Sequence, residues 1–188
     1  MNADPDRCAR YDAFRKIDGA FRAGDLAALR AAVDDPACVP NGPMPIEIGA
    51  CLVYAIYHSP LPFIRTLLEA GADPRPSDHA GFPPLIAALS CTRVQPGAPG
   101  RADVADVIEL LLAFGADPEQ RGVNDYTALH MGAAEGNRRA VESLLAAGAD
   151  PAARTRIDDC ESPRELAARA GFRDIAGLLA AHEGRGRA

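Results

Sequence analysis

The sequence predicts an all-α repeat solenoid built from about five helix-turn-helix units. The tetrapeptide Gly-Ala-Asp-Pro occurs three times, at 71–74, 115–118 and 148–151, and each copy follows an apolar run with helical spacing. The last two copies are 33 residues apart and the first two are 44 apart. A recurrence on this scale is typical of stacked repeat proteins, in which each unit buries its apolar face against its neighbours.

The tetrapeptide itself has the composition of a helix stop followed by a turn. Glycine tolerates the left-handed backbone conformation that commonly follows the last helical residue. Aspartate forms hydrogen bonds with its own backbone in turns, and proline prevents the helix from continuing. Three copies after similar leucine-rich runs therefore indicate one structural unit that is used repeatedly.

The clearest unit covers residues 125–151. Thr127 is expected to cap the start of a first helix over 128–134, and His130 lies where it can reach back to that cap. A break at 135–137 separates it from a second helix over 138–147. The apolar face of this second helix is formed by Ala140, Val141, Leu144 and Leu145.

The pattern T-x-L-H-x-x-A-x-x-G-N, followed by A-V-x-x-L-L-x-x-G-A-D, resembles the ankyrin repeat. In this register a single ankyrin-repeat domain over 1–188 is expected, with projecting β-hairpin or turn fingers between repeats and end repeats that act as caps. Arg164 supports a cap, because it lies where a leucine normally packs. The expected repeats are 12–40, 41–74, 75–118, 119–151 and 152–182.

Two departures from the repeat pattern are informative. The third repeat carries an insert at 92–102, TRVQPGAPGRA, which explains its greater length; its proline and glycine content predicts a loop at the edge away from the fingers. In the fourth repeat Gly122 and Asp125 stand where the family prefers Asp and Gly. An irregular finger turn is expected there.

Composition narrows the class of protein. The net charge of −6, with Lys16 as the single lysine, disfavours nucleic-acid binding. No apolar stretch approaches the ~20 residues that cross a bilayer, and the polar start is unlike a signal peptide. Five cysteines without C-x-x-C spacing fit a reducing compartment, so a cytoplasmic protein is expected. The bias towards Arg, Ala and Gly is similar to that of high-GC bacteria and points to a bacterial source.

Candidate catalytic residues are few. His130 is better explained by the Thr-x-x-His hydrogen bonds of the ankyrin repeat than by a role as base or metal ligand. His58 and His79 lack a second ligand at metal spacing, so neither a metal nor a cofactor is expected. Cys51 and Cys91 lie on first helices, where a redox sensor or cysteine enzyme would need a neighbouring base. The expectation is therefore a protein without enzymatic activity.

The resemblance implies that a partner protein binds the finger tips and a concave groove lined by the first helices. Tyr54, Tyr57, Phe82 and Tyr126 would form an aromatic stripe on this surface, and aromatic residues are enriched in interface hot spots. The alternative is that some of these rings pack between fingers. The predicted partner-binding residues are Ile46, Ile48, Tyr57, His58, His79, Phe82, Asn124, Tyr126, Met131 and Glu135.

The function that the sequence favours is a protein–protein interaction module. The partner is another protein, with no nucleic acid and no membrane involved, and the chain is a monomer or associates weakly with itself. The alternatives are a cysteine-based redox sensor or enzyme, and a self-associating scaffold. Among similar bacterial proteins, the roles of regulator, immunity protein and host-directed effector stay open.

Overall fold

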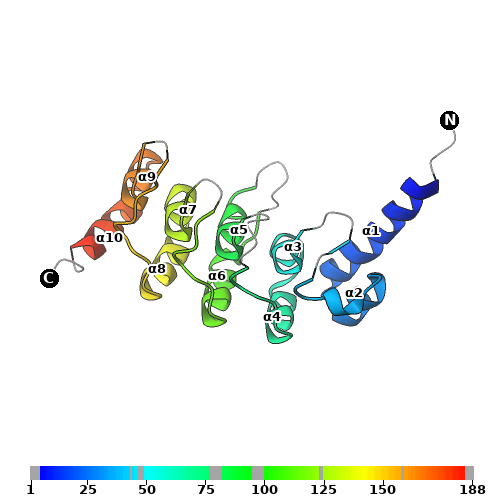
Figure 1. Cartoon of the computed structure of the whole chain (residues 1–188). Helices are drawn as coiled ribbons and strands as arrows, with labels where there is room; N and C mark the ends of the chain where they lie inside the picture. The colour runs from blue at the N-terminus through cyan, green and yellow to red at the C-terminus, as the bar shows by residue number, and fades with distance from the viewer. Residues whose placement is uncertain are drawn as a thin grey trace. The chain divides into compact units, whose positions relative to one another are not determined.

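The protein is described by a computed structural model that covers residues 5–42, 44–45, 49–76, 82–94, 100–122, 125–157 and 159–184. These residues form ten α-helices, one short 3-10 helix and no strand, which confirms the all-α prediction (Figure 1). The chain divides into two compact units, Met1–Asp73 and Pro74–Ala188.

The first unit contains two helical pairs. Helix α1 (Pro5–Ala23) packs on α2 (Leu26–Ala32), and α3 (Cys51–His58) packs on α4 (Leu61–Glu69), with a 3-10 helix (Pro36–Cys38) between the pairs. Helix α1 begins before residue 12, where the first repeat was expected to start. Proline is well tolerated at a first helical position, and no glycine or proline interrupts the chain until Gly19. The fully buried side chains of this unit include Ile17, Phe21, Ile56, Phe63 and Leu67.

The second unit contains three helical pairs. Its first helices are α5 (Pro84–Ser90), α7 (Ala128–Glu135) and α9 (Pro163–Arg169), and α7 packs on both of the others. Its second helices are α6 (Val104–Ala113), α8 (Arg138–Ala146) and α10 (Arg173–Glu183), and α8 packs on both of these. Helices of like kind therefore stack side by side, as repeats do (Figure 1).

The three tetrapeptides end their helices as predicted. Gly71, Gly115 and Gly148 have φ values of 93°, 90° and 91°. The residue after each glycine donates its backbone N–H to a carbonyl five residues back; Ala149 N to Leu144 O, for example, is 3.0 Å. This pattern satisfies carbonyls that the helix end leaves without partners.

Side chains also connect one turn to the next. The amide of Asn41 donates to Gly71 O at 2.7 Å and accepts from Asp73 N at 2.8 Å. In the second unit, Asp150 N donates to the Glu119 carboxylate at 2.9 Å. Contacts between neighbouring turns therefore recur along the chain within each unit.

The insert of the third repeat is closed at its base. Arg101 N donates to Cys91 O at 2.8 Å, and the Arg101 guanidinium holds Asp103 through two contacts of 2.8 Å. Residues 91–94 and 100–103 lie outside any helix, which agrees with the predicted loop. Residues 95–99 lie outside the described part of the chain.

Candidate functional site

The structure describes six of the ten predicted partner-binding residues. Tyr57 and His58 lie in the first unit, and Phe82, Tyr126, Met131 and Glu135 lie in the second. The proposed aromatic stripe joins residues of both units and stays a prediction. The other four residues, Ile46, Ile48, His79 and Asn124, lie outside the described part of the chain.

In the first unit, Tyr54 is used for packing inside the chain. Its ring centroid lies 4.8 Å from that of Phe21 and 4.4 Å from that of His58. Its hydroxyl donates to Asp18 at 2.8 Å, and Arg22 holds the same carboxylate at 2.8 Å. Burial and the Asp18 carboxylate raise the pKa of Tyr54 to about 12. These contacts favour the packing alternative for Tyr54.

In the second unit, two aromatic side chains precede first helices at the same register position. Phe82 lies before Pro83, which occupies the N-cap position of α5 without a side-chain cap hydrogen bond, and Phe82 is 37% exposed. Tyr126 lies before Thr127, the cap of α7, and its half-buried ring stacks on His130 at 5.7 Å. Both aromatic residues thus directly precede the N-cap of a first helix, and their place in a partner-binding surface stays a prediction.

Glu135 has a contact inside the chain that the sequence did not indicate. Its carboxylate accepts from Arg93 Nε at 2.6 Å, and Arg93 also donates to Ala134 O at 3.0 Å. Because this arginine belongs to the insert, Glu135 fixes the base of the insert against the end of α7. Met131, one turn earlier on α7, is half-buried.

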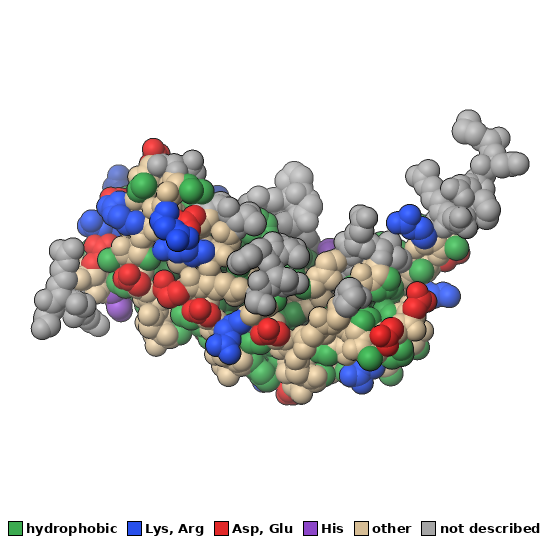
Figure 2. Space-filling view, viewed as in Figure 1, with side chains coloured by type: hydrophobic (Ala, Val, Ile, Leu, Met, Phe, Trp, Pro, Cys, Tyr) green, Lys and Arg blue, Asp and Glu red, His purple; other side chains and the backbone are tan. Residues whose placement is uncertain are grey.

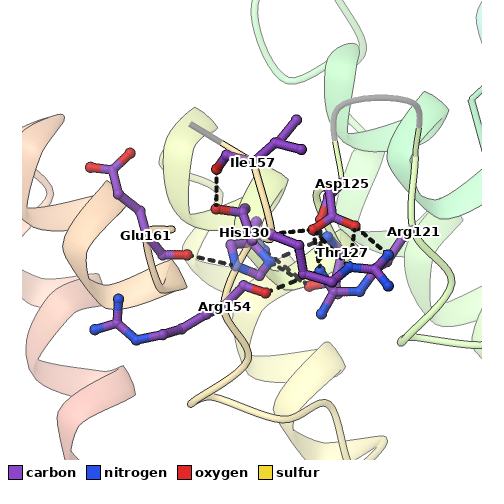
Figure 3. Close-up of polar contacts among 9 residues, drawn as sticks. Arg121, Asp125, Thr127, His130, Arg154, Ile157 and Glu161 are labelled. Carbon is purple, nitrogen blue, oxygen red and sulfur yellow. Dashed lines mark hydrogen bonds and ion pairs between the residues drawn. The ribbon is translucent and has the colours of Figure 1, made fainter. Parts of the chain in front are cut away.

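His130 holds two repeats together (Figure 3). Its ring is fully buried, and Nδ1 accepts from Thr127 N at 3.2 Å. The proton therefore resides on Nε2, which donates to Glu161 O in the next finger at 3.2 Å. Burial lowers the pKa of His130, which keeps the ring neutral. The structural interpretation of His130 is confirmed.

Asp125 organises the irregular finger. It adopts a φ of 61°, and the turn is closed by Gly122 N to Tyr126 O and by Asp125 N to Gly122 O, both at 2.9 Å. Its carboxylate accepts from Arg156 Nη2 at 2.6 Å and from Arg121 Nη1 at 2.9 Å (Figure 3). The Arg156 hydrogen bonds, with help from Arg121, lower the pKa of Asp125 to about 2. The finger of one repeat is thereby tied to the next.

Three exposed residues of the next finger were missed by sequence reasoning. Arg154, Arg156 and Ile157 lie between α8 and α9, and all three side chains are exposed. The sequence does mark this turn as unusually long, because the spacing from Thr127 to Ser162 is two residues longer than the 33-residue repeat period. Extra residues in a turn lengthen the finger and are a common place for binding residues.

The cysteine alternative gains no support from the environment of the two thiols. Cys51 and Cys91 are buried, at 1% and 0% exposure. Burial raises the pKa of Cys51 to about 12 and also raises the pKa of Cys91. A protonated, inaccessible thiol is a poor nucleophile.

The described residues offer neither a metal site nor a membrane span. No three His, Cys, Asp or Glu side chains there lie together in an arrangement that could hold a metal ion. In the same part of the chain, no helix has the length and apolar character that crossing a membrane requires.

Comparison with known proteins follows the same repeats. Residues 52–155, more than half of the chain, match a family described as ankyrin repeats, in three copies. The chain is 36% identical over 126 residues to "Cyclin-dependent kinase 4 inhibitor B" of Mus musculus and of Rattus norvegicus, a match that covers 64% of this chain and 83% of each relative.

A plant relative is longer. The chain is 31% identical over 121 residues to "Putative E3 ubiquitin-protein ligase XBAT35" of Arabidopsis thaliana, which covers 63% of this chain. The match spans only 24% of that relative's length. Together with the helical pairs, the glycine stops and the Thr127–His130 cap, these similarities show that the chain belongs to the ankyrin-repeat family.

Proposed function

We propose that this ankyrin-repeat module binds a partner protein through the fingers and first helices of its second unit. The observation that carries this proposal is the matched position of Phe82 and Tyr126. Both are aromatic, both precede a first helix, and neither is fully buried. When a partner covers the exposed part of an aromatic side chain, that apolar surface is removed from water, which favours binding.

The second helices have a different surface chemistry. Arg139 on α8 lies 2.9 Å from Asp106 and 3.4 Å from Glu109, both on α6. Arg138 on α8 contacts Glu142 at 2.9 Å and Asp174 on α10 at 3.3 Å. These charges pair with one another along the stack, which supports a cohesive role for the second-helix side.

The similarity to the rodent proteins supports a protein as the partner. Their names describe inhibition of a kinase, which is an action on another protein. At 36% identity this supports the class of partner and leaves its identity open. The finger residues of this chain, rather than the names of its relatives, should determine what it binds.

The test is capture of the partner from a lysate of the source organism by the tagged full chain. The double variant Phe82→Ala/Tyr126→Ala should reduce the captured amount at least about tenfold, which corresponds to ~1.4 kcal/mol. Glu142→Ala, on the second-helix side, is the matched control and should capture as well as the unchanged chain. Thermal unfolding of all three proteins shows whether the substitutions leave the fold intact.

Two outcomes would contradict the proposal. Equal capture by the unchanged chain and by the folded double variant would place the partner elsewhere. Capture of nothing but further copies of this chain, with dimers in light scattering, would favour the self-associating scaffold.

The remaining expectations stay predictions of this proposal. They are a monomer or weak self-association, no enzymatic activity, no cofactor or metal, no nucleic acid or membrane partner, and a cytoplasmic location. The relatives named above come from a plant and from rodents, so a bacterial source also stays a prediction.

A further inference from the structure

The finger between α8 and α9 combines an exposed aliphatic side chain with exposed arginines. Ile157 is 43% exposed, whereas each of the other isoleucines that the structure describes is at most 1% exposed. The Ile157 side chain points away from the buried polar cluster formed by Asp125, Thr127 and His130 (Figure 3). Basic, acidic and hydrophobic side chains lie close together around α9 (Figure 2). The arginines that line this finger are Arg154, Arg156 and Arg169.

Three of the four carboxylates that these arginines contact are less exposed than the arginines themselves. The Arg156 side chain is 75% exposed, whereas its partner Asp125 is 10% exposed. Arg169 is 59% exposed, whereas Glu161, 2.9 Å away, is 20% exposed. The charges of Asp125 and Glu161 therefore lie beneath those of Arg156 and Arg169, whereas Asp159, 4.0 Å from Arg169, is 81% exposed.

Internal hydrogen bonds hold this finger in shape. Thr155 N donates to Glu161 O at 3.1 Å and closes the finger across its base. The Arg154 guanidinium donates to Cys160 O and, at 2.9 Å, to the Glu165 carboxylate on α9. Arginines that are already held in position lose little conformational freedom when they bind a ligand.

We propose that this finger binds an acidic segment of the partner protein that carries one apolar side chain. The binding residues, here called the arginine surface, are Arg154, Arg156, Ile157 and Arg169. Carboxylates of the segment would contact the guanidinium groups in the paired geometry that arginine favours. The apolar side chain would cover Ile157. This inference rests on the proposed function and adds the chemistry of the partner.

A nucleic acid fits this surface less well. The chain carries a net charge of −6, and Asp159 lies exposed at the edge of the finger, 4.0 Å from Arg169. A phosphate backbone requires a continuous positive track, which this edge interrupts. A short acidic peptide needs no such continuous track.

Fluorescence anisotropy with defined peptides tests the inference without knowledge of the partner. The probes are labelled short peptides with a central leucine flanked by glutamates, by lysines or by serines, and a single-stranded DNA oligomer of similar length. The full chain should bind the glutamate peptide, and the binding should weaken as NaCl rises from about 0.05 to about 0.5 M, because salt screens exposed charges. The other three probes should bind at least about tenfold more weakly.

Matched variants locate the site. Arg154→Gln/Arg169→Gln should weaken binding of the glutamate peptide about tenfold, and Ile157→Ser should weaken it severalfold. Arg138→Gln/Arg139→Gln removes two exposed, carboxylate-paired arginines from α8 and should leave binding unchanged. Unfolding temperatures measured in parallel confirm that the variants are folded.

The proposal is overturned if the glutamate peptide fails to bind, if DNA binds as tightly, or if both arginine pairs reduce binding equally. These outcomes are separable from failure of the proposed function. If Phe82→Ala/Tyr126→Ala abolishes capture while the glutamate peptide never binds, only the proposal for the arginine surface is wrong. If the peptide binds the arginine surface but the Phe82 and Tyr126 substitutions leave capture unchanged, the proposal that Phe82 and Tyr126 bind the partner is wrong.

Discussion

Asp125 both adopts the backbone conformation that its turn requires and joins two repeats. Its φ of 61° lies in the left-handed region, which aspartate enters more readily than most residues other than glycine. The same residue directs its carboxylate to Arg121 and to Arg156 in the next finger. The departure from the family pattern at this position is thus compensated by an ion-pair network.

This network predicts a specific acid sensitivity. The pKa of Asp125 is about 2 in the folded chain against an ordinary value of 3.8, so its contribution to stability is complete above about pH 4 and is lost as pH falls towards 2. Asp125→Asn, which keeps tolerance for the left-handed backbone, should cost about 1 kcal/mol at pH 7. It should also flatten the fall in unfolding temperature between pH 4 and 2.

The control for this prediction is Asp159→Asn, which removes an exposed carboxylate from the neighbouring finger. Thermal unfolding followed by circular dichroism from pH 2 to 7 provides the measurement. If the unfolding temperature of Asp125→Asn falls between pH 4 and 2 as steeply as that of the unchanged chain, the network does not stabilise the fold.

Thiol chemistry gives a second prediction at the scale of single residues. Cys160 is exposed, whereas Cys51 and Cys91 are buried and have raised pKa values. A disulfide reagent at pH 8 should label Cys160 quickly and should reach Cys51 and Cys91 only as the protein unfolds. Peptide mapping over time checks the order. Rapid labelling of Cys51 or Cys91 in the folded chain would revive the redox alternative.

At the scale of elements, several helix ends could be predicted because their signals are local. Thr127 and Ser162 both form capping boxes, with His130 and Glu165 as the returning side chains. The start of α1 was not predicted, because a repeat register aligns the chain to neighbouring units and carries no information on how far an end helix extends. Leu145, expected on the buried face of α8, is half-exposed at its edge.

Gly136 is the turn glycine under the tightest constraint. It has a φ of 76° after α7, and a Cβ at this position would lie 2.4 Å from Phe172 Cζ. Gly148 has a similar φ of 91°, but a Cβ there would meet nothing within 4 Å. Both positions need glycine for the backbone, and Gly136 needs it for packing as well.

A pair of substitutions separates these two requirements. Gly148→Ala should cost about 1–2 kcal/mol through the left-handed backbone alone. Gly136→Ala should cost more, because the ring of Phe172 must also move, and Phe172→Ala should recover part of the difference. Urea unfolding of the four variants, including the double variant, measures these costs. Equal costs at the two glycines would contradict the close approach of the Phe172 ring to Gly136.

At the scale of the whole molecule, the two compact units predict that damage to one core should be local. Leu67 of α4 and Leu144 of α8 are fully buried in different units. Each substitution to alanine should cost about 2–5 kcal/mol as a core truncation. In repeat proteins such losses act mainly on the altered repeat and its neighbours.

Hydrogen exchange followed by mass spectrometry locates these losses. Leu67→Ala should lower protection most in α3 and α4, and Leu144→Ala most in α7 and α8. Leu145→Ala, at a half-exposed position of the same helix, is the control and should cost less than Leu144→Ala. A uniform loss of protection over the whole chain in either core variant would show that the two units unfold together.

Helix periodicity, caps and glycine stops are properties of short segments, so they could be read from 125–151 without any knowledge of distant residues. They were sufficient for the repeat family and for the structural role of His130. Other features depend on stacking. Glu135 accepts a hydrogen bond from Arg93, which lies 42 residues away in the sequence. Asp125 accepts one from Arg156, which lies 31 residues away in the sequence.

No spacing rule identifies which of nineteen arginines will reach a given carboxylate, because the choice depends on side-chain reach and burial after the repeats have packed. The same is true of exposure. Ile157 reads in the sequence as an ordinary apolar turn residue, and its place at the surface among arginines follows only from the path of the folded finger.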